Sequence, residues 1–210
     1  MEQILIICDK NFFILIKRGN SMLVVEVGLK LDKDLKYYDS ILKKHGLIND
    51  FQVLTHDIYY TNIDLDGLSE YEIKNACIRL RSCNHEGYKV QNNLIKDINI
   101  KEVSDTGLNN FENKLLEFGY KKVFDTIKQD FHYYKEGMSS KVQLQQIENI
   151  GLLVYYDNKD YYDYDFDTQR KNLIDDLNSY GFHFHYDTLG LDKLRTLYYG
   201  REMYSKNQNG

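Results

Sequence analysis

The sequence predicts an α+β fold with antiparallel strands, and three observations support this class. Three amphipathic segments each end in glycine followed by an apolar residue, which is typical of helix C-termini. Between them lie extended segments in which apolar and polar residues alternate, as in strands with one buried face. The chain has 210 residues with 42% hydrophobic and 28% charged residues, enough to bury a core without disulfides.

The predicted helices span residues 35–46, 108–119 and 169–181. Glycine at the end of each takes the left-handed backbone conformation without steric cost, and the apolar residue after it packs back onto the helix. These closing pairs are Gly46-Leu47, Gly119-Tyr120 and Gly181-Phe182.

The predicted strands connect these helices. The regular ones span residues 23–31, 78–81, 141–147 and 154–157, and less regular ones span 92–103 and 125–135. We expect residues 1–21 to form an N-terminal extension with a β-hairpin around residues 8–11. Residues 22–205 would then form the main domain, and residues 206–210 a disordered tail.

Composition and charge exclude several classes of protein. The net charge of −5 argues against general affinity for nucleic-acid backbones, which requires a basic surface. No apolar run is long enough for a transmembrane helix, so we expect no membrane partner. The three cysteines form no C-x-x-C pair, and an odd number favours reduced thiols and a cytoplasmic protein.

Charged residues of both signs occupy the polar faces of the predicted strands: Glu26 and Lys30, Arg79 and Arg81, Lys141, and Asp157. Two interpretations stay open at this point. A one-sided antiparallel sheet would show these faces to water. A sheet closed into a barrel would instead place them in its lumen, where buried charges need a polyanion and a cation to satisfy them.

Several motifs occur in a fixed order along the chain. Residues 26–30 (EVGLK) resemble an E-x-E-x-K strand, 55–60 an aspartate–tyrosine strand, 76–81 (ACIRLR) an A-L-R-x-R strand, 126–133 a K-x-R strand, 145–157 a D-x-V-x-x-L-G and F-V-E-x-E pair, and 192–203 a closing helix. This order resembles the CYTH superfamily over about residues 22–203. The superfamily includes class IV adenylyl cyclases, thiamine triphosphatases and inorganic triphosphatases.

The resemblance implies a closed or nearly closed antiparallel β-barrel of about eight strands with helices packed outside. In this superfamily the barrel is a tunnel that holds a triphosphate and one or two Mg²⁺ or Mn²⁺ ions. Arginine suits phosphate oxygens because its guanidinium is a planar fork, and carboxylates suit magnesium because it prefers hard oxygen ligands. Matched residue by residue, the triphosphate-binding positions are Lys30, Arg79, Arg81 and Lys128, and the metal-binding positions are Glu26 and Asp157. No catalytic residue is assigned.

Four departures from the motifs weaken the implied metal site. Gly28 and Tyr155 stand where the two strands would each carry a further acid, and Gln145 stands in place of an aspartate. Asp130 replaces an arginine and reverses its charge. Because a metal site loses much of its rate when carboxylates are lost, we expect a divergent member of the superfamily with weak or no turnover.

Three functions stay open from the sequence. The first is binding of a nucleotide or other small triphosphate or polyphosphate, such as ATP, thiamine triphosphate or tripolyphosphate, with weak or no turnover. The second is an active Mg²⁺- or Mn²⁺-dependent triphosphatase or class IV-type adenylyl cyclase. The third is a non-catalytic protein-interaction module that uses the acidic, tyrosine-rich residues 155–167. The charged residues could also form internal salt bridges in a vestigial tunnel. The resemblance suggests a monomer or homodimer.

Overall fold

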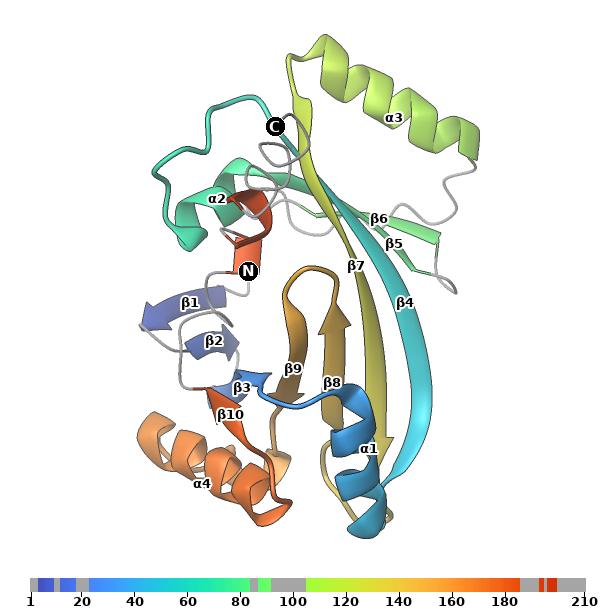
Figure 1. Cartoon of the computed structure of the whole chain (residues 1–210). Coiled ribbons are helices and arrows are strands. Elements are labelled where there is room, and N and C mark those ends of the chain that lie inside the picture. The colour runs from blue at the N-terminus through green and yellow to red at the C-terminus, as the bar shows by residue number, and fades with distance from the viewer. Residues whose placement is uncertain are drawn as a thin grey trace, which may run out of the picture. The chain divides into compact units, whose positions relative to one another are not determined.

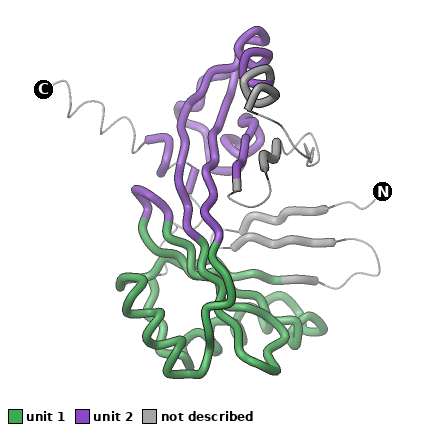
Figure 2. The backbone as a smooth tube through the Cα atoms, turned by 90° about the vertical axis from the view of Figure 1, so that its right-hand side faces the viewer, with its two compact units in different colours: residues 1–52, 130–146, 151–191 green, residues 53–129, 147–150, 192–210 purple. Residues whose placement is uncertain are grey.

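A computed structural model describes residues 4–9, 12–17, 23–83, 87–91, 105–185, 193–194 and 196–199. The predicted strand at 92–103 and the predicted tail at 206–210 lie outside these residues. Two compact units make up the chain (Figure 2): unit 1 contains residues 1–52, 130–146 and 151–191, and unit 2 contains residues 53–129, 147–150 and 192–210. Within the described residues, no helix is long and apolar enough to cross a membrane.

The elements follow each other as β1 (Ile4–Asp9), β2 (Phe12–Lys17), β3 (Leu23–Leu31), α1 (Leu35–Lys44), β4 (Ile48–Thr61), α2 (Glu70–Ala76), β5 (Ile78–Cys83), β6 (Gly87–Gln91), α3 (Asp105–Glu117), β7 (Lys121–Tyr134), β8 (Val142–Ile147), β9 (Gly151–Tyr156), η1 (Lys159–Tyr161), α4 (Phe166–Ser179) and β10 (Phe184–His185). Helices α1, α3 and α4 confirm the three predicted helices. Strands β4 and β7 contribute residues to both units (Figure 2).

Each of the three predicted helices closes as its glycine signature predicts. Gly46, Gly119 and Gly181 all have φ between 80° and 84°. In α1 the amide of Leu47 donates to Leu42 O, and the amide of Gly46 donates to Lys43 O. The equivalent pair of bonds closes α3 and α4, so all three end in the same capping motif.

Unit 1 is built on the strand order β1-β2-β3-β9-β8-β7, with β10 paired to β3. The apolar face of β3 is buried, and its neighbour β9 pairs with it antiparallel, so that Val27 lies opposite Tyr156 and Leu29 opposite Val154. Helices α1 and α4 complete this core through Leu42, Leu173 and other buried residues. The polar face of β3 is thereby turned away from the core of the unit.

Unit 2 is built on the strand order β7-β4-β5-β6. One face of β4 and β5 is apolar and packs on α3, which lies beside β5 and β6 in Figure 1. Tyr60, Ile78, Leu80 and Leu115 form this cluster. Helix α2 was not among the predicted helices, although Ser69 and Glu72 form a capping box at its start.

The α+β class and the antiparallel sheet with helices are confirmed, whereas a closed barrel is not. The hydrogen-bonded order ends at β1 on one side and at β6 on the other. No pairing among the described strands joins these two ends. In the first strands, β1 pairs antiparallel with β2, and β2 pairs with β3. The division of the chain at residue 21 stays a prediction.

Candidate functional site

The polar face of β4 and β5 in unit 2 gathers most of the predicted triphosphate-binding residues. Along β4, Asp57 and Tyr59 alternate with residues that face α3. The antiparallel register places Asp57 opposite Arg81 and Tyr59 opposite Arg79. Because paired residues of an antiparallel ladder share a face, both arginines lie on the same side of the sheet as Asp57.

Asp57 is the centre of this group, which we call the Asp57 cluster (Asp57, Arg79, Arg81 and Lys128). Arg81 holds it with both prongs of its guanidinium, Nε to Oδ1 at 2.6 Å and Nη2 to Oδ2 at 2.8 Å. Lys128 of β7 donates to Oδ2 of Asp57. Arg79 lies farther away, with Nη1 3.9 Å from Oδ2. Asp57 has no exposed surface and the side chain of Lys128 is 2% exposed.

The electrostatics of the cluster are those of a buried and coupled group. Burial alone would raise the pKa of Asp57, but the hydrogen bond from Arg81 and the charges of Lys128, Arg81 and Arg79 hold it well below its usual range. Burial and the positive charges of Lys193 and Arg81 lower the pKa of Lys128, against the opposing effect of Asp57. The Asp57 carboxylate is therefore ionised at neutral pH. The surroundings of Lys128 disfavour its charged, ammonium form.

Positive charge exceeds negative charge in the Asp57 cluster. One carboxylate faces two guanidiniums and one ammonium, and Lys193 adds a further positive charge near Lys128. Among the described residues, the buried Nε of Arg79 and the buried Oγ1 of Thr126 have no hydrogen-bond partner. Buried polar groups usually have partners, and an excess of buried positive charge needs an anion. Chemically, the cluster can hold phosphate oxygens.

The burial of these residues decides between the two interpretations of the polar faces in unit 2. A one-sided sheet would leave the face opposite its apolar core open to water. Here Asp57, Lys128 and Thr126 are all buried, while the opposite face carries the apolar cluster under α3. In this part of the chain, the water-facing interpretation is therefore wrong.

A second polar site lies in unit 1, at a pocket with a volume of about 310 Å³. Both predicted metal-binding residues line it, Glu26 from β3 and Asp157 just after β9. The other lining residues supply ammonium, hydroxyl, amide and aromatic groups: His132, Ser139, Ser140, Lys141, Gln143, Tyr155 and Lys159. The predicted residue Lys30 is on the same face of β3 as Glu26, two positions beyond Gly28, but does not line this pocket.

Gly28 and Tyr155, two of the departures from the family motifs, contact each other directly. They are paired across β3 and β9. A Cβ atom on Gly28 would lie 2.8 Å from Cε1 and 3.1 Å from Cδ1 of the Tyr155 ring. The ring therefore occupies the space that any side chain at position 28 would need. The two departures are coupled by sterics and are not independent losses.

We expect Gly28→Ala to lower the free energy of unfolding by about 1–3 kcal/mol, because the methyl group overlaps the ring of Tyr155. The same substitution in a Tyr155→Leu background should cost much less, since the smaller side chain leaves room. Urea unfolding of the four proteins of this double-mutant cycle measures the difference. An equal loss of unfolding free energy in both backgrounds would show that the contact between the two residues does not affect stability.

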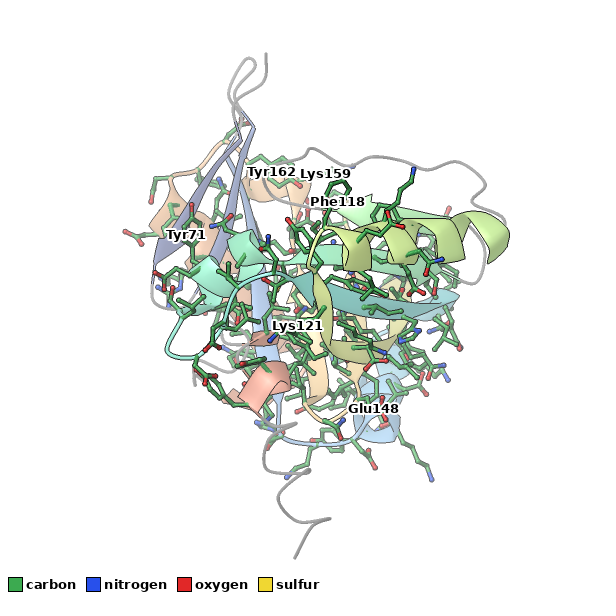
Figure 3. All side chains as sticks on the ribbon, turned by 90° about the horizontal axis from the view of Figure 1, so that it is seen from above. Tyr71, Phe118, Lys121, Glu148, Lys159 and Tyr162 are labelled. Carbon is green, nitrogen blue, oxygen red and sulfur yellow. The ribbon has the colours of Figure 1, made fainter. Side chains whose placement is uncertain are left out.

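A tyrosine from the segment after β9 donates a hydrogen bond to Asp157 and feels the charge of Glu26. Tyr162 donates its hydroxyl to Oδ2 of Asp157 at 2.7 Å. Burial, Asp157 and, to a smaller extent, Glu26 all raise the pKa of Tyr162, so the phenol stays protonated and keeps donating. Figure 3 labels Tyr162 together with the pocket residue Lys159, which comes from the same segment.

Asp130 and Gln145, the other two departures, also contact each other. The amide of Gln145 donates to Oδ1 of Asp130 at 2.6 Å, and the amide of Gln143 donates to the same atom at 3.0 Å. Both Asp130 and Gln145 are buried. The carboxylate of Asp130 is thus held by two amides, at a position where the motif has an arginine.

The residues present do not fit a divalent metal centre well. Magnesium takes six oxygen ligands in octahedral geometry, usually one or two carboxylates together with waters and substrate phosphates. Nowhere in the described ranges do three or more acidic, histidine or cysteine side chains converge as metal ligands. One oxygen of Asp157 is already taken by Tyr162, and the Tyr155 ring covers the next position along both strands.

The acidic, tyrosine-rich residues 155–167 fold back onto α4 and are not an open loop. Asp176 of α4 accepts hydrogen bonds from Tyr156 at 3.0 Å and from Tyr161 at 2.9 and 3.0 Å. Asn158 also donates to Asp176, at 3.3 Å. Several tyrosine hydroxyls are thus occupied within the chain, which weakens the case for this segment as a protein-contact surface.

The sequence matches no family model and no curated protein. Its fold is similar to solved structures. The PH1012 protein of Pyrococcus horikoshii OT3 matches with a TM-score of 0.52 at 12% identity over 78% of this chain and 95% of the other. A conserved hypothetical protein of Pyrococcus furiosus matches with a TM-score of 0.51 at 12% identity, over 77% and 96% of the two chains. A candidate adenylate cyclase of Vibrio parahaemolyticus matches with a TM-score of 0.48 at 14% identity, over 76% and 88%.

The two Pyrococcus structures share the fold of this chain, and the CYTH resemblance comes from the sequence motifs. At such identities the likeness concerns the fold alone. The described chain brings Arg79, Arg81 and Lys128 together in unit 2, and brings Glu26 and Asp157 to one pocket in unit 1.

Asp57 and Lys193 were not among the predicted site residues. Asp57 is the anchor of the cluster, and its signal was its alternation with Tyr59 on a strand next to the Arg79–Arg81 strand. Lys193 acts on Lys128 through its charge. It lies 65 positions later in the chain, so no local pattern could have connected the two.

Proposed function

We propose that this protein binds a small triphosphate or polyphosphate through the Asp57 cluster, with weak or no turnover. The excess of positive charge in that cluster carries the proposal. Asp57 orients Arg81 and Lys128, and within the cluster it is one carboxylate beside three cations. A phosphate group would supply the missing negative charge and acceptors for the buried Nε of Arg79.

The proposal of weak turnover rests on the unit 1 pocket. Phosphoryl transfer with metal ions needs carboxylates that hold the ions on the phosphate oxygens. Glu26 and Asp157 would hold Mg²⁺ or Mn²⁺ if one bound, and the ion would supply the charge neutralisation that phosphoryl transfer needs. With only these two carboxylates at the pocket, and with Tyr162 bonded to one of them, such an ion would be held weakly.

An alternative in which the cations form only internal salt bridges has one observation in its favour. Asp57 already pairs with both Arg81 and Lys128. Of the three cations, Arg79 is held least closely by that carboxylate: its Nη1 is 3.9 Å from Oδ2, its side chain also interacts with Tyr59, and its buried Nε has no hydrogen-bond partner among the described residues. Arg79 is therefore the residue that distinguishes binding from a vestigial ion-pair network.

Thermal melts with tripolyphosphate, ATP and thiamine triphosphate, each with and without Mn²⁺, test the proposal. A ligand at 100 times its Kd adds about 2.7 kcal/mol to the stability of a protein that binds it only when folded. For a chain of this size, that is a rise in Tm of several degrees. We expect Arg79→Gln to lose at least half of the rise while it still folds, since Asp57 keeps its other two partners.

Lys121→Gln is the matched control. It removes one positive charge from unit 2, but Lys121 is exposed at the start of β7 (Figure 3) and outside the Asp57 cluster. We expect its melts to follow those of the wild type. No rise with any of the three ligands, or an equal rise in Arg79→Gln and the wild type, would rule out phosphate binding at this cluster.

A further inference from the structure

The strand pair that carries Glu26 and Asp157 has an aromatic ring beside these two carboxylates, over Gly28. The β3–β9 register pairs Val27 with Tyr156 and Gly28 with Tyr155. Continued by one residue, this register sets Glu26 opposite Asp157, so the two carboxylates are neighbours at one pocket. The next pair on the same face is Gly28 and Tyr155, and the Tyr155 ring covers Gly28.

This arrangement limits the oxygen donors available to a cation. A divalent ion held by the two carboxylates would need further oxygen ligands, from side chains, water or a phosphate. Gly28 offers no side chain, and Tyr155 supplies a ring whose Cε1 is 2.8 Å from the place of a Cβ at position 28. On the other side, Tyr162 donates to Asp157, and Lys141 and Lys159 bring positive charge to the same pocket.

We propose that Tyr155 is a specificity-determining residue, which excludes divalent cations from the unit 1 pocket by filling the space over Gly28. The Tyr162 hydroxyl, in place of a metal ion, satisfies Asp157.

Titration of Mn²⁺ into the protein without any phosphate, followed by electron paramagnetic resonance of the free ion, measures this exclusion. We expect the wild type to bind Mn²⁺ weakly, with a Kd above about 1 mM, because two carboxylates are too few. Tyr155→Asp removes the ring and adds a third carboxylate at the next pair along the same face as Glu26 and Asp157. It should bind Mn²⁺ at least about 10-fold more tightly than Tyr155→Asn, which has the same shape without the charge.

A second pair of variants isolates the ring from the added charge. Gly28→Asp places a carboxylate where the ring lies, and we expect it to gain little Mn²⁺ affinity. Gly28→Asp combined with Tyr155→Leu frees the space and should bind Mn²⁺ at least about 10-fold more tightly than Gly28→Asp alone. Circular dichroism establishes whether each variant is folded. If Gly28→Asp is unfolded, the comparison of Tyr155→Asp with Tyr155→Asn decides the outcome.

Either of two results would overturn the proposal. One is wild-type Mn²⁺ binding as tight as that of Tyr155→Asp and lost in Glu26→Gln. The other is equal Mn²⁺ affinity of Tyr155→Asp and Tyr155→Asn. Because Mn²⁺ is the only ligand in these titrations, the result does not depend on phosphate binding at the Asp57 cluster, and the two proposals can fail separately.

Discussion

Replacement of Asp57 by asparagine is expected to lower the free energy of unfolding by about 3–5 kcal/mol, because it leaves buried cations without their counter-charge. Asp57 is completely buried and is the shared partner of Arg81 and Lys128. Asparagine keeps the shape but provides no negative charge. Urea unfolding at neutral pH measures the loss, and a saturating concentration of tripolyphosphate should restore part of it by supplying the missing anion.

Asp125→Asn is the control for this variant. Asp125, on β7, is also in unit 2 and contacts His56 and Lys122, but it is partly exposed, so its loss should cost less than about 1 kcal/mol. A cost for Asp57→Asn as small as for Asp125→Asn would contradict the role of Asp57 as the anchor of the cluster.

The acid limb of the stability curve provides an independent check on Asp57. Its folded-state pKa lies below the ordinary value of 3.8, so the unfolded chain binds a proton at this position at higher pH than the folded chain does. The stabilisation by Asp57 is therefore complete above that ordinary value and is lost as the pH falls below it. The wild type should show this loss, and Asp57→Asn should show a smaller one.

Replacement of Lys128 by methionine is expected to weaken triphosphate binding about 10- to 100-fold, which corresponds to the loss of one charged hydrogen bond. Its effect on stability should be small by comparison. Burial already disfavours the charge of Lys128, and an apolar side chain of similar length removes that cost while Arg81 still pairs with Asp57. Calorimetric titration with tripolyphosphate and urea unfolding measure the two effects separately.

The pH dependence of binding follows from the lowered pKa of Lys128. A bound anion favours the ammonium form, so binding takes up a proton once part of Lys128 is neutral. Affinity in the wild type should therefore fall between about pH 7 and about pH 9. Lys128→Met should show a flatter profile in the same buffers, and the comparison cancels the titration of the ligand itself. Parallel profiles would contradict a role for this ammonium in binding.

Local patterns in the sequence predicted the elements well, because their causes are local. The glycine and apolar residue after each of α1, α3 and α4 satisfy the last carbonyls of the same helix, so a few residues decide where the helix ends. The alternation along β3 likewise follows from one buried face. Helix α2 has an equally local signal in its capping box, but it does not end in the glycine that marks the other three helices.

The site depended on contacts that no local pattern contains. Arg79 and Arg81 could be placed on one face from their spacing, but their shared partner Asp57 becomes visible only through the β4–β5 register. The four departures from the motifs could be counted as losses in the sequence. In the structure they form two contacting pairs, Gly28 with Tyr155 and Asp130 with Gln145. Strand pairing, which sets both contacts, is a long-range property.

The central claim is that the Asp57 cluster holds a triphosphate. Calorimetric titration of tripolyphosphate into the wild-type protein, without divalent cations, tests it most directly, with Arg79→Gln titrated in parallel. We predict saturable binding of one ligand per chain below about 1 mM, and weaker binding in the variant. The absence of saturable heat in the wild type over that range, or an isotherm that Arg79→Gln leaves unchanged, would contradict it.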